Sequence, residues 1–182
     1  MENITAMLDQ PVILMSKHQS AWETIALLAL MPKQLCFVFK RELLWVPFFG
    51  WALGMLRMIH INRSKSAAAS QSIASQGKKY LSKGLWIIIF PEGTITSSGK
   101  LIPFKNGPFK LALDTQVPIV PLAFKNNWKY LQNGGFFKSL GQPGFPTLTI
   151  GKPILTDASN TDSLEEIKQK VYTFMQAHTL SQ

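Results

Sequence analysis

A histidine and a glutamate five positions apart, His18 and Glu23, stand between two apolar runs near the start of this 182-residue chain. The run before them is short and typical of a strand, and the run after them is long enough for two helical turns. On one continuous helix, side chains five positions apart point about 140° away from each other, so these two could not meet. If His18 lies in the loop before the helix and Glu23 in its first turn, the carboxylate can fold back onto one imidazole nitrogen. The other nitrogen is then free to accept a proton, as a general base must.

The same residues have an ordinary interpretation. Ser20 and Glu23 match the capping-box pattern, which predicts a helix from Ser20 to Met31 in which Glu23 is only a cap residue. His18 would then be only a polar loop residue. Both interpretations start the helix at Ser20, so this stretch alone leaves them open.

Three later clusters could bind an anion. Arg63 stands at the end of an expected strand, where a guanidinium could hold a phosphate through two hydrogen bonds. Glu92-Gly93-Thr94 follows a very apolar strand, and loops at the carboxyl ends of strands often gather ligands. Gly93 would let backbone N–H groups approach an anion, and Lys105 adds a cation near an expected helix start. The alternatives are a surface charge for Arg63, a simple turn for Gly93 and a solvated side chain for Lys105.

Strand-like and helical segments alternate along the chain and must position these residues. We expect strands at 11–17, 35–39, 59–63, 85–90, 117–124 and 146–154, and helices at 20–31, 66–83, 104–115 and 163–177. The run at 85–90 is β-branched without alternation, which predicts a strand buried on both faces. The prolines at 117–124 predict an end or an edge position. The alternation predicts an α/β fold in a single domain spanning 1–182, with a central mixed, largely parallel sheet covered by helices.

Fourteen consecutive residues without charge, from Leu43 to Leu56, form the longest apolar run. A helix that crosses a bilayer needs about 20 such residues, and Pro47, Gly50 and Gly54 weaken this one further. Its two tryptophans and two phenylalanines favour a helix that lies in a membrane interface. A helix buried against the sheet is the alternative.

The formal net charge of +9 predicts an anionic partner: a nucleic acid, a phospholipid surface or a phosphorylated substrate. Thirteen Lys or Arg residues lie between positions 17 and 113 against three acids, so the half with the candidate site residues is the basic half. No groove-reading or base-stacking motif accompanies the charge, so we do not expect nucleic acid. The single cysteine, Cys36, forms no intrachain disulfide, and residues 1–10 do not resemble a signal peptide. These features predict a reducing, cytoplasmic-side environment.

The order and spacing of four motifs resemble those of the glycerolipid acyltransferases. The motifs are His18-x-x-x-x-Glu23, Ile61-Asn62-Arg63, Phe90-Pro91-Glu92-Gly93-Thr94 and Val117-Pro118-Ile119-Val120-Pro121. Within that superfamily the chain is most similar to bacterial 1-acylglycerol-3-phosphate acyltransferases, over about residues 11–124. The segment from Lys40 to Trp51 also looks like the family's stretch between its first two motifs.

The resemblance implies a glycerol-3-phosphate acyltransferase-like fold and transfer of a fatty acyl group to the free hydroxyl of 1-acylglycerol-3-phosphate. The acyl donor would be a coenzyme A or acyl-carrier-protein thioester, with no cofactor and no metal. By position, the resemblance implies a catalytic base at His18 oriented by Glu23. It implies substrate binding by a second set: Lys40, Arg63, Glu92, Gly93, Thr94 and Lys105. It further implies membrane association at the cytoplasmic face of the inner (plasma) membrane.

The sequence departs from the family pattern at four points. Glu23 stands where Asp is more usual, Lys17 where Asn is usual and Ile95 where Arg is usual. The chain also begins almost on the first motif, whereas many relatives carry apolar helices before it. Two other functions stay open. Ile95 motivates an acyltransferase for another lysolipid or glycerol 3-phosphate, and the net charge alone motivates a non-catalytic module that binds anionic membranes.

Overall fold

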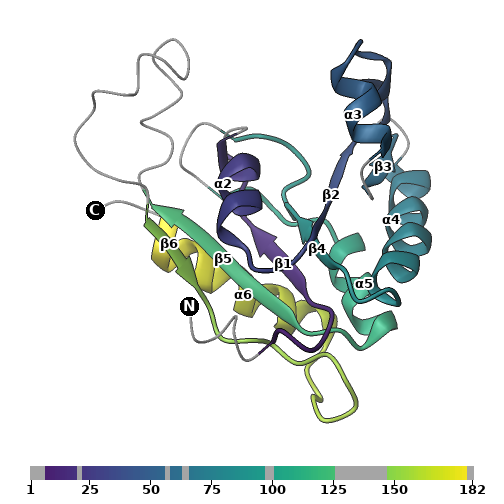
Figure 1. Ribbon diagram of the computed structural model, residues 1–182. Coiled ribbons are helices and arrows are strands. Elements are labelled where there is room, and N and C mark those ends of the chain that lie inside the picture. Colours follow the sequence, from purple (N-terminus) through teal and green to yellow (C-terminus); the bar gives the residue numbers. More distant parts are fainter. Residues whose placement is uncertain are drawn as a thin grey trace.

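The structure is a computed structural model that describes residues 7–19, 22–55, 58–62, 66–96, 101–125 and 147–179 (Figure 1). Its strands are β1 (Ile13–Ser16), β2 (Leu35–Lys40), β3 (Ile59–Ile61), β4 (Trp86–Ile89), β5 (Ile119–Lys125) and β6 (Thr147–Ile150). Its helices are α2 (Trp22–Leu30), the 3-10 helix η1 (Arg41–Trp45), α3 (Phe49–Met55), α4 (Ser66–Leu81), α5 (Gly107–Thr115) and α6 (Leu164–Thr179). The predicted strands and helices therefore all occur, most of them with shorter bounds.

The strands form one six-stranded sheet in the order β3-β2-β4-β1-β5-β6. All neighbours pair in parallel except β5 and β6, which are antiparallel. The predicted mixed, largely parallel sheet covered by helices is confirmed. Because five strands run the same way, their carboxyl ends lie along one edge of the sheet.

Alternate residues of the central strands pack into two cores, one on each face of the sheet. Ile13 and Met15 of β1 pack on the same side as α4, α5 and α6, whereas Val12 and Leu14 pack on the side of α2. The four residues of β4 are likewise buried throughout, as the unalternating run predicts. Figure 1 shows α2 on one face and α4, α5 and α6 on the other. The central strands are therefore rigid supports for the loops that follow them.

The prolines at 117–124 predict an end or an edge. The edge is wrong, because β5 lies inside the sheet between β1 and β6, whereas the end is confirmed: Pro118 stands directly before β5. Pro121 stands one residue outside the β5–β6 ladder, whose last pair is Leu122 with Ile150. Its carbonyl oxygen still accepts a hydrogen bond from the Gly151 N–H at 2.8 Å. The missing N–H of the proline therefore falls where the ladder has already ended.

Two expected elements differ from their predicted bounds. The helix expected from Phe104 starts at Gly107, because the Lys105 N–H donates to the Pro91 carbonyl at 2.8 Å and holds that segment outside the helix. The strand expected at 146–154 ends at Ile150, and Ile154 forms only an isolated bridge with Ile119.

The apolar run from Leu43 is divided between two short helices, η1 and α3, and is not one helix. Phe48 lies between them with a φ of 61°, a left-handed conformation that interrupts helical geometry. Figure 1 shows α3 standing beyond the end of β2, away from the sheet. The alternative of a helix buried against the sheet is wrong for the described large side chains, because Trp45, Phe48, Trp51 and Met55 are all exposed.

Candidate active site

The carboxyl ends of β1 and β4 form the centre of the candidate site. These strands are neighbours in the sheet, so the loop after β1, which carries His18, meets the loop after β4, which carries Glu92. Residues that are 74 positions apart in the sequence thus come into hydrogen-bonding contact.

Glu23 folds back onto His18. One carboxylate oxygen, Oε2, lies 3.2 Å from His18 Nδ1, and the other, Oε1, accepts the backbone N–H of Gln19 at 3.0 Å. The Glu23 side chain is fully buried, whereas the His18 ring keeps 12% of its surface exposed. Glu23 lies in the first turn of α2 and His18 in the loop before it, as the geometric argument expected. The arrangement leaves His18 Nε2 as the nitrogen available to a substrate.

Glu92 holds the loop of His18 from the other side. Its Oε2 accepts the backbone N–H of His18 at 3.1 Å, and its Oε1 accepts the Ile102 N–H at 3.4 Å. Thr96 closes the connection: its N–H donates to the His18 carbonyl at 2.9 Å, and its hydroxyl lies 3.2 Å from Glu92 Oε1. The histidine is therefore fixed through its ring by α2 and through its backbone by the loop after β4.

Three charged side chains are buried in the described part of the chain, and all three belong to this region: Lys17, Glu23 and Glu92. Burial raises the pKa of the Glu92 carboxyl, and hydrogen bonds from the backbone of His18 and Ile102, together with the charge of Lys17, oppose that rise. Burial lowers the pKa of the Lys17 ammonium, and the charges of Glu92 and then Glu23 oppose that fall. The lysine and the two carboxylates are therefore electrostatically coupled.

A cleft of about 520 Å³ lies beside the histidine, between the strand ends and the helices α4 and α5. Phe90 joins the two, because it lines the cleft and stacks on the His18 ring with centroids 4.0 Å apart and planes at 13°. Most of the lining is apolar, including Val38, Ile61, Ile73, Ile89 and Phe104. Lys105, Lys110 and the first residues of α5 add positive potential at one end. The cleft thus suits a molecule with an apolar chain and an anionic group.

Of the other predicted site residues, some are described by the structure and some are not. Gly93 lines the cleft with a φ of 71°, a backbone conformation that favours glycine. A β-carbon at this position would lie 3.6 Å from the Lys105 side chain. Thr94 is exposed in the same loop. Arg63 and Ser20 lie outside the described residues, and of Lys40 only the backbone is described, at the end of β2. Their predicted roles stay predictions.

Sequence reasoning missed three contributions to this site. Thr96 and Phe90 hold the histidine through contacts between segments distant in sequence, for which the local sequence carries no signal. The Glu92 carboxylate, expected to shape the acceptor site, is 1% exposed and bonded to protein groups. Lys17 is 2% exposed, although a lysine before a polar loop normally predicts a solvated side chain. The only signal in the sequence was that Lys17 stands where the family pattern has Asn.

The arrangement can deprotonate a hydroxyl group. A buried carboxylate that orients a partly exposed imidazole is the geometry of a general base, and the cleft beside it can hold the molecule to be deprotonated. In the described part of the chain, no three His, Cys, Asp or Glu residues come together to hold a metal ion. Nor does that part contain a helix both long and apolar enough to cross a bilayer.

Comparisons with known proteins agree with this geometry. Residues 1–125 match the family model described as Acyltransferase. The chain is 38% identical over 170 residues to the 1-acyl-sn-glycerol-3-phosphate acyltransferase of Pseudomonas aeruginosa, covering 93% of this chain and 63% of that protein. It is 35% identical over 117 residues to the beta form of the same enzyme from Homo sapiens, covering 64% of this chain and 42% of that protein.

A solved structure shares the fold. The 1-acyl-sn-glycerophosphate (LPA) acyltransferase PlsC from Thermotoga maritima superposes with a TM-score of 0.76 at 26% sequence identity, covering 97% of this chain and 67% of that one. The chain spans less than two thirds of the length of the two curated relatives it matches.

Proposed function

The chain belongs to the acyltransferase family, and on that premise we propose that it makes phosphatidic acid. It would transfer a fatty acyl group from a coenzyme A or acyl-carrier-protein thioester to the free hydroxyl of 1-acylglycerol-3-phosphate, a step of phospholipid biosynthesis. The observation that carries the proposal is the contact between His18 Nδ1 and the buried Glu23 carboxylate. The names of the relatives support this choice of acceptor.

The chemistry requires one base and no covalent intermediate on the protein. His18 Nε2 takes the proton of the acceptor hydroxyl as its oxygen attacks the thioester carbonyl carbon. The resulting tetrahedral intermediate collapses, the carbon–sulfur bond breaks, and the imidazolium returns the proton to the leaving thiolate. Glu23 stabilises the imidazolium in between, because its carboxylate lies 3.2 Å from Nδ1. The single cysteine, Cys36, is buried and takes no part.

The cleft supports an amphiphilic acceptor. Its apolar lining suits an acyl chain, and Lys105 with the start of α5 suits a phosphate group. We assign phosphate binding to Arg63 as well, with assistance from Lys40, and the shape of the acceptor site to the loop of Glu92, Gly93 and Thr94. The partners are thus a lysophospholipid, an acyl thioester and a membrane surface at the cytoplasmic face of the inner (plasma) membrane.

Acyl transfer to lysophosphatidate by the purified protein tests the proposal. We expect His18→Ala to lower kcat/KM by about 10²-fold or more, which is the scale of removing a general base. The matched control is His178→Ala, because His178 stacks on Phe174 in α6, far along the chain from the site. An alanine variant at position 18 as active as the parent would remove His18 as the base.

Ile95 favours a second candidate acceptor. It is 52% exposed in the loop after β4, where a cation is usual in the family pattern, so one phosphate contact of that pattern is missing. A lysolipid with another head group, or glycerol 3-phosphate, is the alternative that follows. Competition among acceptors in one assay decides between these substrates. A preference for a phosphate-free acceptor would show that lysophosphatidate is not the acceptor. Binding to anionic vesicles without turnover would favour a non-catalytic module.

A further inference from the structure

The segment from Arg41 to Met55, called here the hairpin, contains η1, a turn and α3 and exposes an unusual set of side chains. Trp45 is 82% exposed, Phe48 78% and Met55 87%, and Trp51 and Val46 are also exposed. Scattered apolar residues are normal on a protein surface, but a contiguous group on one element marks an interaction site.

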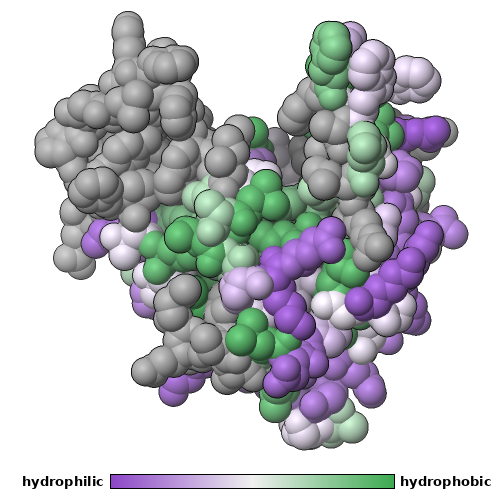
Figure 2. Space-filling view, in the orientation of Figure 1, coloured by the Kyte–Doolittle hydropathy of each residue, from purple (hydrophilic) through white to green (hydrophobic). Residues whose placement is uncertain are grey.

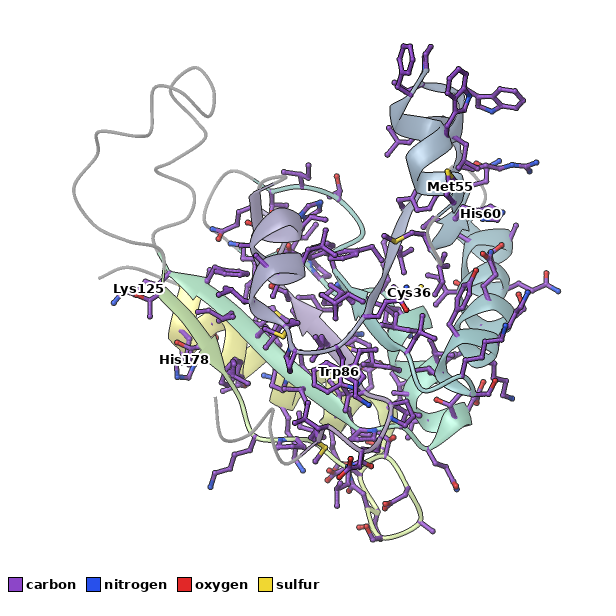
Figure 3. The ribbon with its side chains drawn as sticks, viewed as in Figure 1. Cys36, Met55, His60, Trp86, Lys125 and His178 are labelled. Atoms are coloured by element: carbon purple, nitrogen blue, oxygen red, sulfur yellow. The ribbon has the colours of Figure 1, made fainter. Side chains whose placement is uncertain are left out.

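The backbone of the hairpin turns these side chains outward. A β-carbon on Gly50 would lie 2.1 Å from the Leu44 carbonyl oxygen, so α3 packs directly on the backbone of η1. Phe48 and Trp51 contact each other with ring centroids 5.3 Å apart. No residue of η1 is buried, so the described part of the hairpin has almost no core of its own. Figure 2 shows its tip standing free of the neighbouring surface, and Figure 3 shows its side chains pointing away from the sheet.

We propose that the hairpin is the element that docks this protein onto an anionic lipid bilayer, with Trp45, Phe48 and Trp51 in the interface. Tryptophan favours the boundary between head groups and acyl chains. Arg41 and Glu42, both exposed at the base of the hairpin, offset each other in charge, so the electrostatic attraction to anionic lipid comes from the net charge of +9 of the whole chain. This rests on the proposed function only for the lipid nature of the substrate.

The hairpin lies along the same edge of the sheet as the candidate active site. It continues directly from the carboxyl end of β2, along the same edge of the sheet as His18 after β1 and Glu92 after β4. A bilayer that holds the hairpin would therefore face the edge at which the cleft lies. A lysophospholipid could then enter the cleft without crossing much water.

Vesicle co-sedimentation tests docking without any need for turnover. With vesicles of phosphatidylcholine and phosphatidylglycerol, we expect the variant Trp45→Ser, Phe48→Ser, Trp51→Ser to partition about tenfold or more less strongly than the parent, since each aromatic ring contributes substantial apolar area. Leu155→Ser is the matched control, because Leu155 is also exposed but lies outside the hairpin. It should bind like the parent.

Two glycines of α3 provide a second pair of variants. Gly50→Ala must disrupt the contact of α3 with η1, whereas Gly54→Ala meets no atom within 4 Å. We expect weaker vesicle binding only for Gly50→Ala, with an unchanged melting temperature of the domain. Equal binding by the parent and the aromatic variant would overturn docking. So would a dimer of the parent in the absence of lipid that the aromatic variant cannot form, because the occupant would then be a second copy of the chain.

Assays with two forms of the acceptor separate docking from the proposed function. With a short-chain lysophosphatidate dispersed as monomers, the aromatic variant should turn over like the parent, and with the acceptor in vesicles it should be slower. If both proteins use the vesicle acceptor equally well, docking is overturned and the proposed function stands. If the parent binds vesicles through the hairpin but transfers no acyl group, docking stands and the proposed function fails.

A second inference concerns Lys17, on an independent observation. The two carboxylates that hold His18 are buried, and the side chain of Lys17, the residue directly before His18, is buried too and interacts with the charges of Glu92 and then Glu23. We infer that Lys17 is a positioning residue that balances Glu23 and Glu92, so that both carboxylates keep their hydrogen bonds to the histidine loop. This too rests on the proposed function only for the role of His18.

The pH profile of kcat/KM distinguishes this role from simple packing. Glu23 from α2 contacts the ring of His18, Glu92 from the loop after β4 accepts its backbone N–H, and Lys17, next to it in the chain after β1, interacts with the charges of both carboxylates. In Lys17→Met the carboxylates lose their buried cation, and the cluster binds a proton more readily. We therefore expect the acid limb of the profile to move to higher pH by roughly one unit or more, the scale set by a nearby charge.

Ile13→Val is the control, because it removes one methyl group from the same strand, β1, without changing any charge. It should lower stability slightly and leave the acid limb in place. The nuclear magnetic resonance signal of the His18 backbone N–H, which donates to Glu92, follows the protonation of that carboxylate with pH and supplies a readout that does not need turnover. A midpoint that Lys17→Met leaves unchanged would overturn the inference, even if the variant is less stable. A moved midpoint in a protein that transfers no acyl group would support it while the proposed function fails.

Discussion

The helices α2 and α6 begin with the same sequence pattern and use it differently. In both, a serine before the helix is followed three positions later by a glutamate in its first turn: Ser20 and Glu23 at α2, and Ser163 and Glu166 at α6. At α6 the carboxylate of Glu166 accepts the N–H of Ser163 at 2.6 Å, and the Ser163 hydroxyl oxygen accepts the N–H of Glu166 at 3.3 Å. This is a capping box on an exposed surface.

At α2 the carboxylate reaches past the helix start. Glu23 is fully buried and bonds the Gln19 N–H and the ring of His18. The pattern therefore predicts a helix start in both places, but it does not say whether the acid serves only the helix. That depends on the residue before the helix and on whether a neighbouring loop buries the carboxylate.

Replacing the acid by its amide should give the largest difference between the two helix starts. In Glu23→Gln an amide N–H would donate to His18 Nδ1, which places the ring proton on Nε2 and leaves no base at the cleft. We expect kcat/KM to fall by about 10²-fold or more. Glu166→Gln should leave acyl transfer unchanged. Equal activity of the two variants would show that Glu23, too, is only a cap residue.

Shortening the acid by one methylene should have an intermediate effect. The Glu23 carboxylate spans two partners, at 3.2 Å and 3.0 Å, from a position in the first turn of α2. Aspartate cannot reach both without movement of the loop, so we expect Glu23→Asp to lower kcat/KM by roughly tenfold, below the scale of removing the base. Undiminished activity would show that the loop adapts to the residue more usual in the family pattern.

Removing the cap at α6 should affect stability alone. Ser163→Ala deletes the hydroxyl that receives the Glu166 N–H, and loss of such a cap costs about 1 kcal/mol. Denaturant unfolding measures this, and acyl transfer per folded molecule should not change. A large loss of activity would connect α6 to the site, although no residue of α6 lines the cleft.

The smallest effect should come from acid titration. Hydrogen bonds from Ser163 hold the pKa of the Glu166 carboxyl below its usual 4.5. A lowered folded-state value means that this carboxylate stabilises the fold above its usual pKa and loses that contribution as the pH falls through the folded-state value. The stability difference between the parent and Glu166→Gln should thus be constant near neutral pH and shrink below about pH 4.5. A difference that instead grows on acidification would contradict the assignment.

Local patterns were sufficient to predict the fold. Apolar periodicity located the six strands and the helices α2, α4, α5 and α6 to within a few residues, because the central strands must be apolar on both faces, but it did not locate η1 and α3 as separate helices. The contact of His18 with Glu23 was also predictable, since it depends only on a loop and the first turn of a helix.

Contacts across the sheet were not predictable from local patterns. The burial of Lys17 and the bond from the His18 backbone to Glu92 depend on β1 lying beside β4, which the order of strands in the sequence does not give. The turn at Phe48 was likewise missed, because a left-handed phenylalanine has no local sequence signal.

The pairing of β1 with β4 has a consequence for how this chain acquires its activity. The bond between His18 and Glu92 spans 74 residues of sequence, so it can form only after the intervening chain, with three α-helices, the 3-10 helix η1 and three strands, has been brought together. Contacts of such high sequence separation form slowly. On refolding, helical circular dichroism should therefore return before acyl transfer does, and a chain arrested with separate β1 and β4 would be structured yet inert.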